Sequence, residues 1–211
     1  MIARLFAVIA ALGFAVSVEA AEITTDGKVV WISGPFVSAD GERFKSVSAA
    51  VRDGATIVLE SEGGSAGASI AIGEEIKRRK FATAVLARKS CVSACAFAWL
   101  AGNPRIMDRA ARIGFHAVYL VEDGRPVTST AANAVMGSYL GSLGIPASAI
   151  YFATSAGPDG MNWMTQDIAS KLGVSVFVFG TTTTDQHPNF GRLRKPPKSK
   201  KSLLNQLYGS D

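Results

Sequence analysis

Strand-like and helix-like segments alternate along this chain of 211 residues, and this alternation limits the folds that it can adopt. Short apolar runs are followed by stretches in which apolar residues recur at helical spacing. We expect strands at 29–37, 55–60, 81–86, 113–120 and 174–179, and helices at 42–51, 65–80, 93–101, 128–143, 146–156 and 166–172. Parallel strands need crossover connections, which helices usually supply. The alternation therefore predicts an α/β fold with a mainly parallel sheet and helices on both faces.

The first 20 residues have the three parts of a secretory signal peptide. Arg4 supplies a positive charge, residues 5–18 are uncharged and mainly apolar, and small residues occupy positions 18 and 20. The apolar run is shorter than the roughly 20 residues that cross a bilayer, which argues against an uncleaved anchor. We therefore expect cleavage after Ala20 and a periplasmic or secreted mature protein.

The positive charge of the chain is concentrated at its C-terminal end. The formal net charge is +5, but residues 191–211 hold six basic residues and only one acidic residue. The rest of the chain is neutral, which argues against a nucleic-acid-binding face. We expect a signal peptide at 1–20, one α/β domain at 21–180 and a polar, basic tail at 181–211. The tail is either a solvated end or a contact to an anionic membrane surface or an acidic partner.

Three candidate catalytic features lie near the ends of expected strands. A glycine pair, Gly63-Gly64, precedes one expected helix, Ser93 starts the next, and His116 ends an apolar strand segment that begins at Ile113. Sites in open α/β sheets form beyond the carboxyl ends of strands, where helix N-termini expose backbone amides. A serine nucleophile also needs a base, and the only other histidine, His187, lies in the polar part of the tail, before its basic residues. Although a glycine turn and a strand-end histidine are each ordinary structural features, their order predicts a hydrolase.

The two cysteines, Cys91 and Cys95, enclose this serine. An even cysteine count in an exported protein favours a disulfide. Residues four apart in a helix are too distant for the bond, so Cys91 would have to lie before the helix. The bridge would stiffen the loop that presents Ser93. A redox switch and free buried thiols remain alternatives, whereas two thiols and at most one nearby histidine are too few for a zinc site, so we expect no metal.

Three segments resemble the motifs of the Clp protease proteolytic subunit, in the Clp/crotonase superfamily. They read SEGGS at 61–65, SACAFAWLAG at 93–102 and IGFH at 113–116. The likeness covers roughly residues 57–176 and includes WMT at 163–165 and KLGV at 171–174. It implies a spiral-like ββα fold with Ser93 as nucleophile and His116 as general base. It also implies an oxyanion hole formed by the amides of Gly63 and Ala94.

The third member of a catalytic triad does not match this family. The position of the family's aspartate falls at Met161. Asp159 and Asn162 are close in sequence, and of the two we select Asp159 to orient His116. Loss of the orienting residue can lower the turnover of a triad enzyme by about 10⁴-fold.

The sequence thus predicts an exported serine hydrolase that acts on peptide bonds and needs no cofactor. The alternative is a catalytically silent Clp-like module that binds peptides or scaffolds an assembly, which the missing aspartate favours. Acyl-CoA chemistry on the related crotonase scaffold fits the glycine turn but not export, because CoA substrates are cytoplasmic. The cytoplasmic relatives depend on ATP-driven unfoldases, and an exported protein would lack ATP. We therefore expect small, unfolded substrates or a self-contained homo-oligomer.

Overall fold

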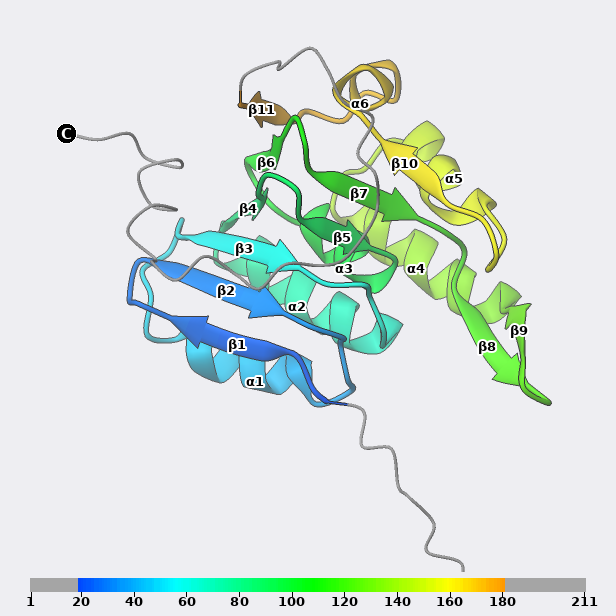
Figure 1. Ribbon diagram of the computed structural model, residues 1–211, viewed down its shortest axis with the longest axis horizontal. Helices are drawn as coiled ribbons and strands as arrows, with labels where there is room; N and C mark the ends of the chain where they lie inside the picture. The colour runs from blue at the N-terminus through cyan, green and yellow to red at the C-terminus, as the bar shows by residue number, and fades with distance from the viewer. Residues whose placement is uncertain (1–18, 181–211) are drawn as a thin grey trace, which may run out of the picture. The chain divides into compact units, whose positions relative to one another are not determined.

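A six-stranded sheet forms one side of the molecule in the computed structural model, which describes residues 19–180 (Figure 1). Its strands lie in the order β1-β2-β3-β4-β6-β11. They span Glu22–Thr25 (β1), Val29–Ser33 (β2), Thr56–Glu60 (β3), Ala82–Val85 (β4), Arg105–Asp108 (β6) and Phe177–Phe179 (β11). Only β1 runs antiparallel to its neighbour. Residues 1–18 of the expected signal peptide and the whole expected tail, 181–211, lie outside the described residues.

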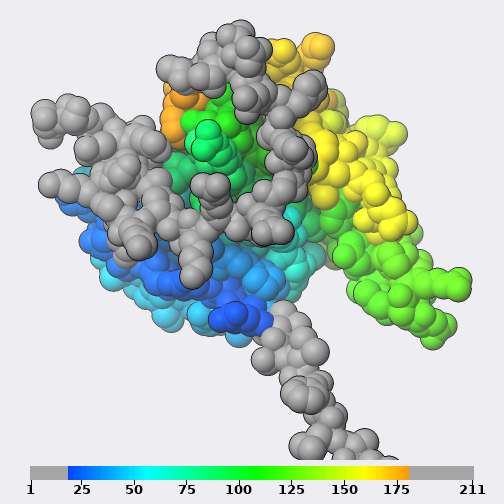
Figure 2. All heavy atoms as spheres, viewed as in Figure 1, coloured from blue at the N-terminus to red at the C-terminus, as the bar shows by residue number. Residues whose placement is uncertain are grey.

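A second, three-stranded sheet carries the candidate site. It has the order β10-β7-β5, with β5 (Ser90–Val92) parallel to β7 (Arg112–Phe115) and β10 (Asn162–Met164) antiparallel to β7. After β7 the chain forms a separate hairpin of β8 (Tyr119–Glu122) and β9 (Arg125–Thr128). The hairpin projects from one edge of the molecule (Figure 2).

Six helices connect these strands. They span Asp40–Ser48 (α1), Ala66–Arg78 (α2), Ala94–Trp99 (α3), Thr130–Ser142 (α4), Ala147–Ser155 (α5) and Gln166–Lys171 (α6). Helices α1 and α2 lie behind the six-stranded sheet in the view of Figure 1. All six residues of α3 are buried, and Trp99, Phe97 and Phe115 are among the largest side chains of the core. No helix among residues 19–180 has the length and apolar content needed to cross a bilayer.

Side-chain caps explain why several of these helices begin where they do. The hydroxyl of Ser65 accepts a hydrogen bond from the Ala68 amide at 3.2 Å, and Ser129 and Thr165 cap α4 and α6 in the same way. Such caps satisfy amides that have no partner within the helix. The cap at Ser65 begins α2 directly after the glycine pair.

The α/β fold with a mainly parallel sheet is confirmed, with one local difference that matters for the site. We expected a strand over residues 113–120, but β7 ends at Phe115 and leaves His116 in a connecting segment. The hairpin that follows turns at Asp123 and Gly124, whose φ angles are +50° and +75°. Positive φ at both positions is typical of a tight two-residue hairpin turn. This turn creates the additional strand pair.

Candidate active site

Ser93 lies on a sharp turn between β5 and α3. Its φ of +55° and ψ of −125° are unusual for a residue with a side chain, at a cost of order 1–3 kcal/mol. The Ser93 amide donates a hydrogen bond to the carbonyl of Gly114 on β7, at 2.8 Å. The Ser93 hydroxyl does not cap α3. This strand-turn-helix geometry holds a partly exposed serine at the end of a strand, as nucleophile elbows do.

The glycine turn packs directly against Ser93. Ser61 forms a parallel bridge with Cys91, and its carbonyl accepts a hydrogen bond from the Val92 amide at 3.0 Å. Gly63 follows with a φ of +102°, and a Cβ built there would lie 2.7 Å from the Cβ of Ser93. A side chain at position 63 would therefore displace the serine, so this close approach requires glycine.

The amide of Ala94 is the clearest oxyanion donor at the turn. Ala94 is the first residue of α3, and its N–H makes no hydrogen bond with any residue of the range 19–180. The Gly63 amide donates to the Ser61 hydroxyl at 3.0 Å, whereas the Gly64 amide has no partner within that range. The Gly63 amide must leave Ser61 before it can bind a substrate oxygen. The oxyanion role of Gly63 stays a prediction.

A disulfide links the strand before Ser93 to the helix after it, across the turn that we call the serine turn. Cys91 on β5 is bonded to Cys95 on α3, with their Cα atoms 5.1 Å apart, and both residues are fully buried. Cys91 therefore lies before the helix, as the bond requires. Because the sulfurs are bonded to each other, neither thiol is free to ligate a metal. Among the described residues no group of three or more histidine, cysteine or acidic side chains could hold a metal ion.

His116 lies just beyond the end of β7, the strand that pairs with β5 before Ser93. Val92 pairs with Gly114, so the chain reaches Ser93 and His116 just beyond the parallel ends of β5 and β7. The imidazole is 7% exposed, and its Nδ1 lies 2.8 Å from the carbonyl oxygen of Ala117. A carbonyl oxygen only accepts hydrogen bonds, so Nδ1 carries the proton and Nε2 is left as the basic nitrogen. No hydrogen bond joins Ser93 to His116 within the described part of the chain.

Among residues 19–180, no carboxylate forms a hydrogen bond or ion pair with His116. Asp159 is exposed in the turn between Gly157 and Gly160, and it makes no hydrogen bond or ion pair with a described residue. The Asn162 side chain instead donates to the Phe152 carbonyl at 2.7 Å. The orienting role of Asp159 stays a prediction.

Met161, at the sequence position that the resemblance assigns to the acid, and the segment after His116 each make a local contact near the site. The sulfur of Met161 packs over Gly114, whose hypothetical Cβ would lie 2.7 Å from it. The Ala117 carbonyl holds Nδ1 of His116, and the Ala117 amide is itself anchored to the Ala156 carbonyl at 2.8 Å. Sequence reasoning missed the Ala117 contact, because a backbone carbonyl has no residue signature.

Comparisons with known proteins agree with this architecture. No protein-family description and no curated protein matches the sequence. Two similar solved structures are of 1510-N, a membrane-bound stomatin-specific protease. Its serine-to-alanine mutant has a TM-score of 0.54 at 21% identity and covers 71% of this chain and 77% of its own. Its lysine-to-alanine mutant, in complex with a substrate peptide, has a TM-score of 0.52 at 22% identity, with 71% and 73% covered. The likeness shows that the chain shares the fold of these two structures.

Proposed function

We propose that this protein is a serine hydrolase that cleaves peptide bonds, with Ser93 as its nucleophile. The observation that carries the proposal is the turn at Ser93, where a non-glycine residue with φ of +55° opens a buried helix. Backbone strain of this kind persists where the surrounding structure enforces it, and it is concentrated at functional sites. The solved protease structures of the same fold support the reaction class.

The local geometry supports a two-stage acyl transfer. Nε2 of His116 would accept the hydroxyl proton of Ser93 as the serine oxygen attacks the peptide carbonyl. The Ala94 amide, with one from the Gly63-Gly64 turn, would donate to the oxyanion. His116 then returns the proton to the leaving amine, and water releases the acyl group by the same route. In this proposal the Ala117 carbonyl, or Asp159 after a local rearrangement, keeps the required tautomer of His116.

A lysine base fits this chain poorly. The lysine substituted in one similar structure raises that alternative. Here, however, no lysine stands between Lys89 and Lys171. Lys89 precedes β5 and pairs with Glu60 at 2.7 Å, at the opposite end of the strand from Ser93. His116, just beyond the end of the neighbouring strand β7, is therefore the better candidate.

The expected setting of the enzyme follows from its sequence. We place it in the periplasm or outside the cell, where short or unfolded peptides would be substrates because no ATP-driven unfoldase can act. A substrate peptide bound to a protein of this fold supports that class of ligand. We also propose self-association, because α4, α5 and the β8-β9 hairpin expose apolar side chains and residues 126–158 include no charged residue.

Covalent labelling tests the nucleophile. The mature chain is treated with a fluorophosphonate probe, and the adduct is located by mass spectrometry. We expect modification at Ser93, its loss in Ser93→Ala, and at least a hundredfold slower labelling in His116→Ala. Ser129→Ala is the matched control, because Ser129 also precedes a helix but lies outside the site.

The rival proposal is a silent module that binds peptides. The absence of a Ser93–His116 hydrogen bond and of a carboxylate at the ring favours it, although catalytic hydrogen bonds are often long in ligand-free structures. If folded protein forms no Ser93-dependent adduct but still binds unfolded peptides, the silent module is correct and the hydrolase proposal fails.

A further inference from the structure

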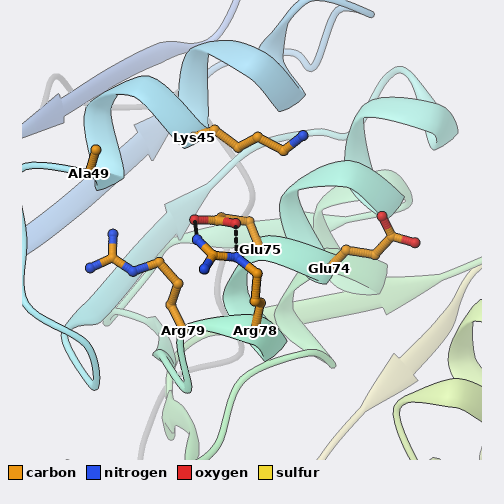
Figure 3. Close-up of a pocket in the computed structure, with 6 residues that line it drawn as sticks. All are labelled: Lys45, Ala49, Glu74, Glu75, Arg78 and Arg79. Carbon is orange, nitrogen blue, oxygen red and sulfur yellow. Dashed lines mark hydrogen bonds and ion pairs between the residues drawn. The ribbon is translucent and has the colours of Figure 1, made fainter.

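Charged side chains line two hollows of the molecule, and carboxylates neutralise the cations in only one of them. The first hollow, between α1 and α2, has a volume of about 460 Å³ (Figure 3). Arg78 donates to both carboxylate oxygens of Glu75 at 2.8 and 2.6 Å, and Lys45 pairs with Glu42 at 2.8 Å. Arg79, also at this hollow, pairs with Asp53. These cations have carboxylate partners and need no ligand.

The second hollow, which we call the basic pocket, has three cations and no acidic residue among its lining residues. Its volume is about 540 Å³, and Lys77, Lys80 and Arg105 supply its charge. The wall comes from the end of α2, the segment between α3 and β6, the turn between α4 and α5, and residues 173–175. Segments distant in sequence thus bring like charges together without a carboxylate.

Arg105 is the least solvated of the three cations. Its Nε donates to the Leu100 carbonyl at 2.6 Å, and within residues 19–180 its guanidinium forms no ion pair. Burial lowers the pKa of Arg105, because the guanidinium loses hydration, and the nearby Tyr139 phenol opposes this shift. A guanidinium has five N–H donors, so most of its hydrogen-bonding capacity is available. A partly buried cation of this kind is stabilised by an anion that enters the pocket.

Two helix C-termini offset only part of the positive charge in the basic pocket. The Lys77 ammonium contacts the Ser142 carbonyl at the end of α4, and Arg105 contacts Leu100 at the end of α3. Each helix C-terminus carries about half a negative charge, which is less than the cation that it meets. Lys80 makes no hydrogen bond or ion pair with a side chain in the described part of the chain. A net positive potential therefore remains in the pocket.

We propose that the basic pocket binds a phosphate group. Guanidinium groups match the oxygens of phosphate with paired hydrogen bonds, and lysines add point charges. The volume exceeds that of one tetrahedral ion, so either free phosphate or a small phosphate ester fits. The pocket lies at the amino ends of β4 and β6. Helix α2 begins beside the glycine turn and ends at this pocket, a length of about 20 Å, so the pocket is distinct from the Ser93 site.

Calorimetric titration of the mature chain with inorganic phosphate, at constant ionic strength with chloride, tests this site. The decisive variants are Lys80→Gly and its matched control Arg88→Gly. Both residues are exposed, basic and in the left-handed region, with φ of +53° and +62°, but only Lys80 lines the pocket. We expect saturable binding by the wild type, a loss of affinity of about tenfold in Lys80→Gly, and wild-type affinity in Arg88→Gly.

A second variant and a second ligand complete the design. Arg105→Gln should remove measurable binding, and if it fails to fold by circular dichroism, Lys80→Gly carries the test alone. Tighter binding of glycerol 3-phosphate than of inorganic phosphate would identify an ester as the occupant, and equal binding would identify the free ion. The proposal is overturned if phosphate binds no better than chloride, or if both glycine variants weaken binding equally.

Discussion

At the scale of single residues, the hydrogen-bond partner of His116 determines the catalytic rate that we expect. A carbonyl such as that of Ala117 fixes the tautomer as a carboxylate would, but it carries no full charge to stabilise the imidazolium formed during attack. Met161 occupies the position where the resemblance places the acid. The site therefore has the orientation function of a triad without its electrostatic function, and we expect slow turnover.

Substitutions at positions 159 and 161 separate these two functions. We expect Asp159→Asn to keep the wild-type rate within about threefold, because Asp159 is exposed and the Ala117 carbonyl already holds Nδ1. Met161→Asp should raise kcat on a peptide ester at least tenfold by supplying the missing charge. Met161→Asn, which has the same size without the charge, is its control. A large loss of rate in Asp159→Asn would instead show that Asp159 orients His116 during catalysis.

At the scale of secondary-structure elements, the hydrophobic pattern decided what sequence could predict. The apolar runs around β3 and β4 and the helical spacing of α2 located these elements to within one or two residues. The missed strands β1, β5, β6, β9 and β10 have only three or four residues and lie in no continuous apolar run. Ser93 and His116 were predictable because they follow strands. The Ala117 contact was not, because it depends on where the segment after β7 docks against α5.

The disulfide between β5 and α3 leads to a prediction about the serine turn. Replacing both Cys91 and Cys95 with alanine should lower the free energy of unfolding by about 2 kcal/mol, the entropic effect of a closed loop of about five residues. It should also slow fluorophosphonate labelling of Ser93 at least fivefold, because the turn loses its support. Urea unfolding and labelling kinetics measure the two effects.

A control separates local positioning by the disulfide from general stability. Met136→Ala removes a fully buried side chain of α4 and should cost about 2–5 kcal/mol. In this variant the fluorophosphonate probe should modify Ser93 at the wild-type rate, because α4 does not contact the serine turn through any described hydrogen bond. If the double alanine variant also labels at the wild-type rate, the disulfide stabilises the fold without positioning Ser93.

At the scale of the whole molecule, charge is unevenly distributed over the described surface. No charged residue stands between Arg125 and Asp159, although these residues form β9, α4 and α5. Val135 and Tyr151 are exposed there, and Leu120 and Val121 of the hairpin are exposed as well. Depletion of charge together with exposed aromatic and aliphatic side chains is typical of the central part of a protein interface. A second copy of the chain is the partner that we expect on this surface.

Two aromatic-to-glutamate substitutions test this expectation in a matched pair. Tyr151 is 75% exposed within the charge-free stretch, and Phe177 is 67% exposed on β11 outside it. Light scattering coupled to size-exclusion chromatography should show an oligomer for the wild type and for Phe177→Glu. Tyr151→Glu should be monomeric or dissociate at least tenfold more readily, since a buried, unpaired carboxylate opposes association. A monomeric wild type at 100 μM, a concentration on the order of a weak complex, would rule out self-association through this surface.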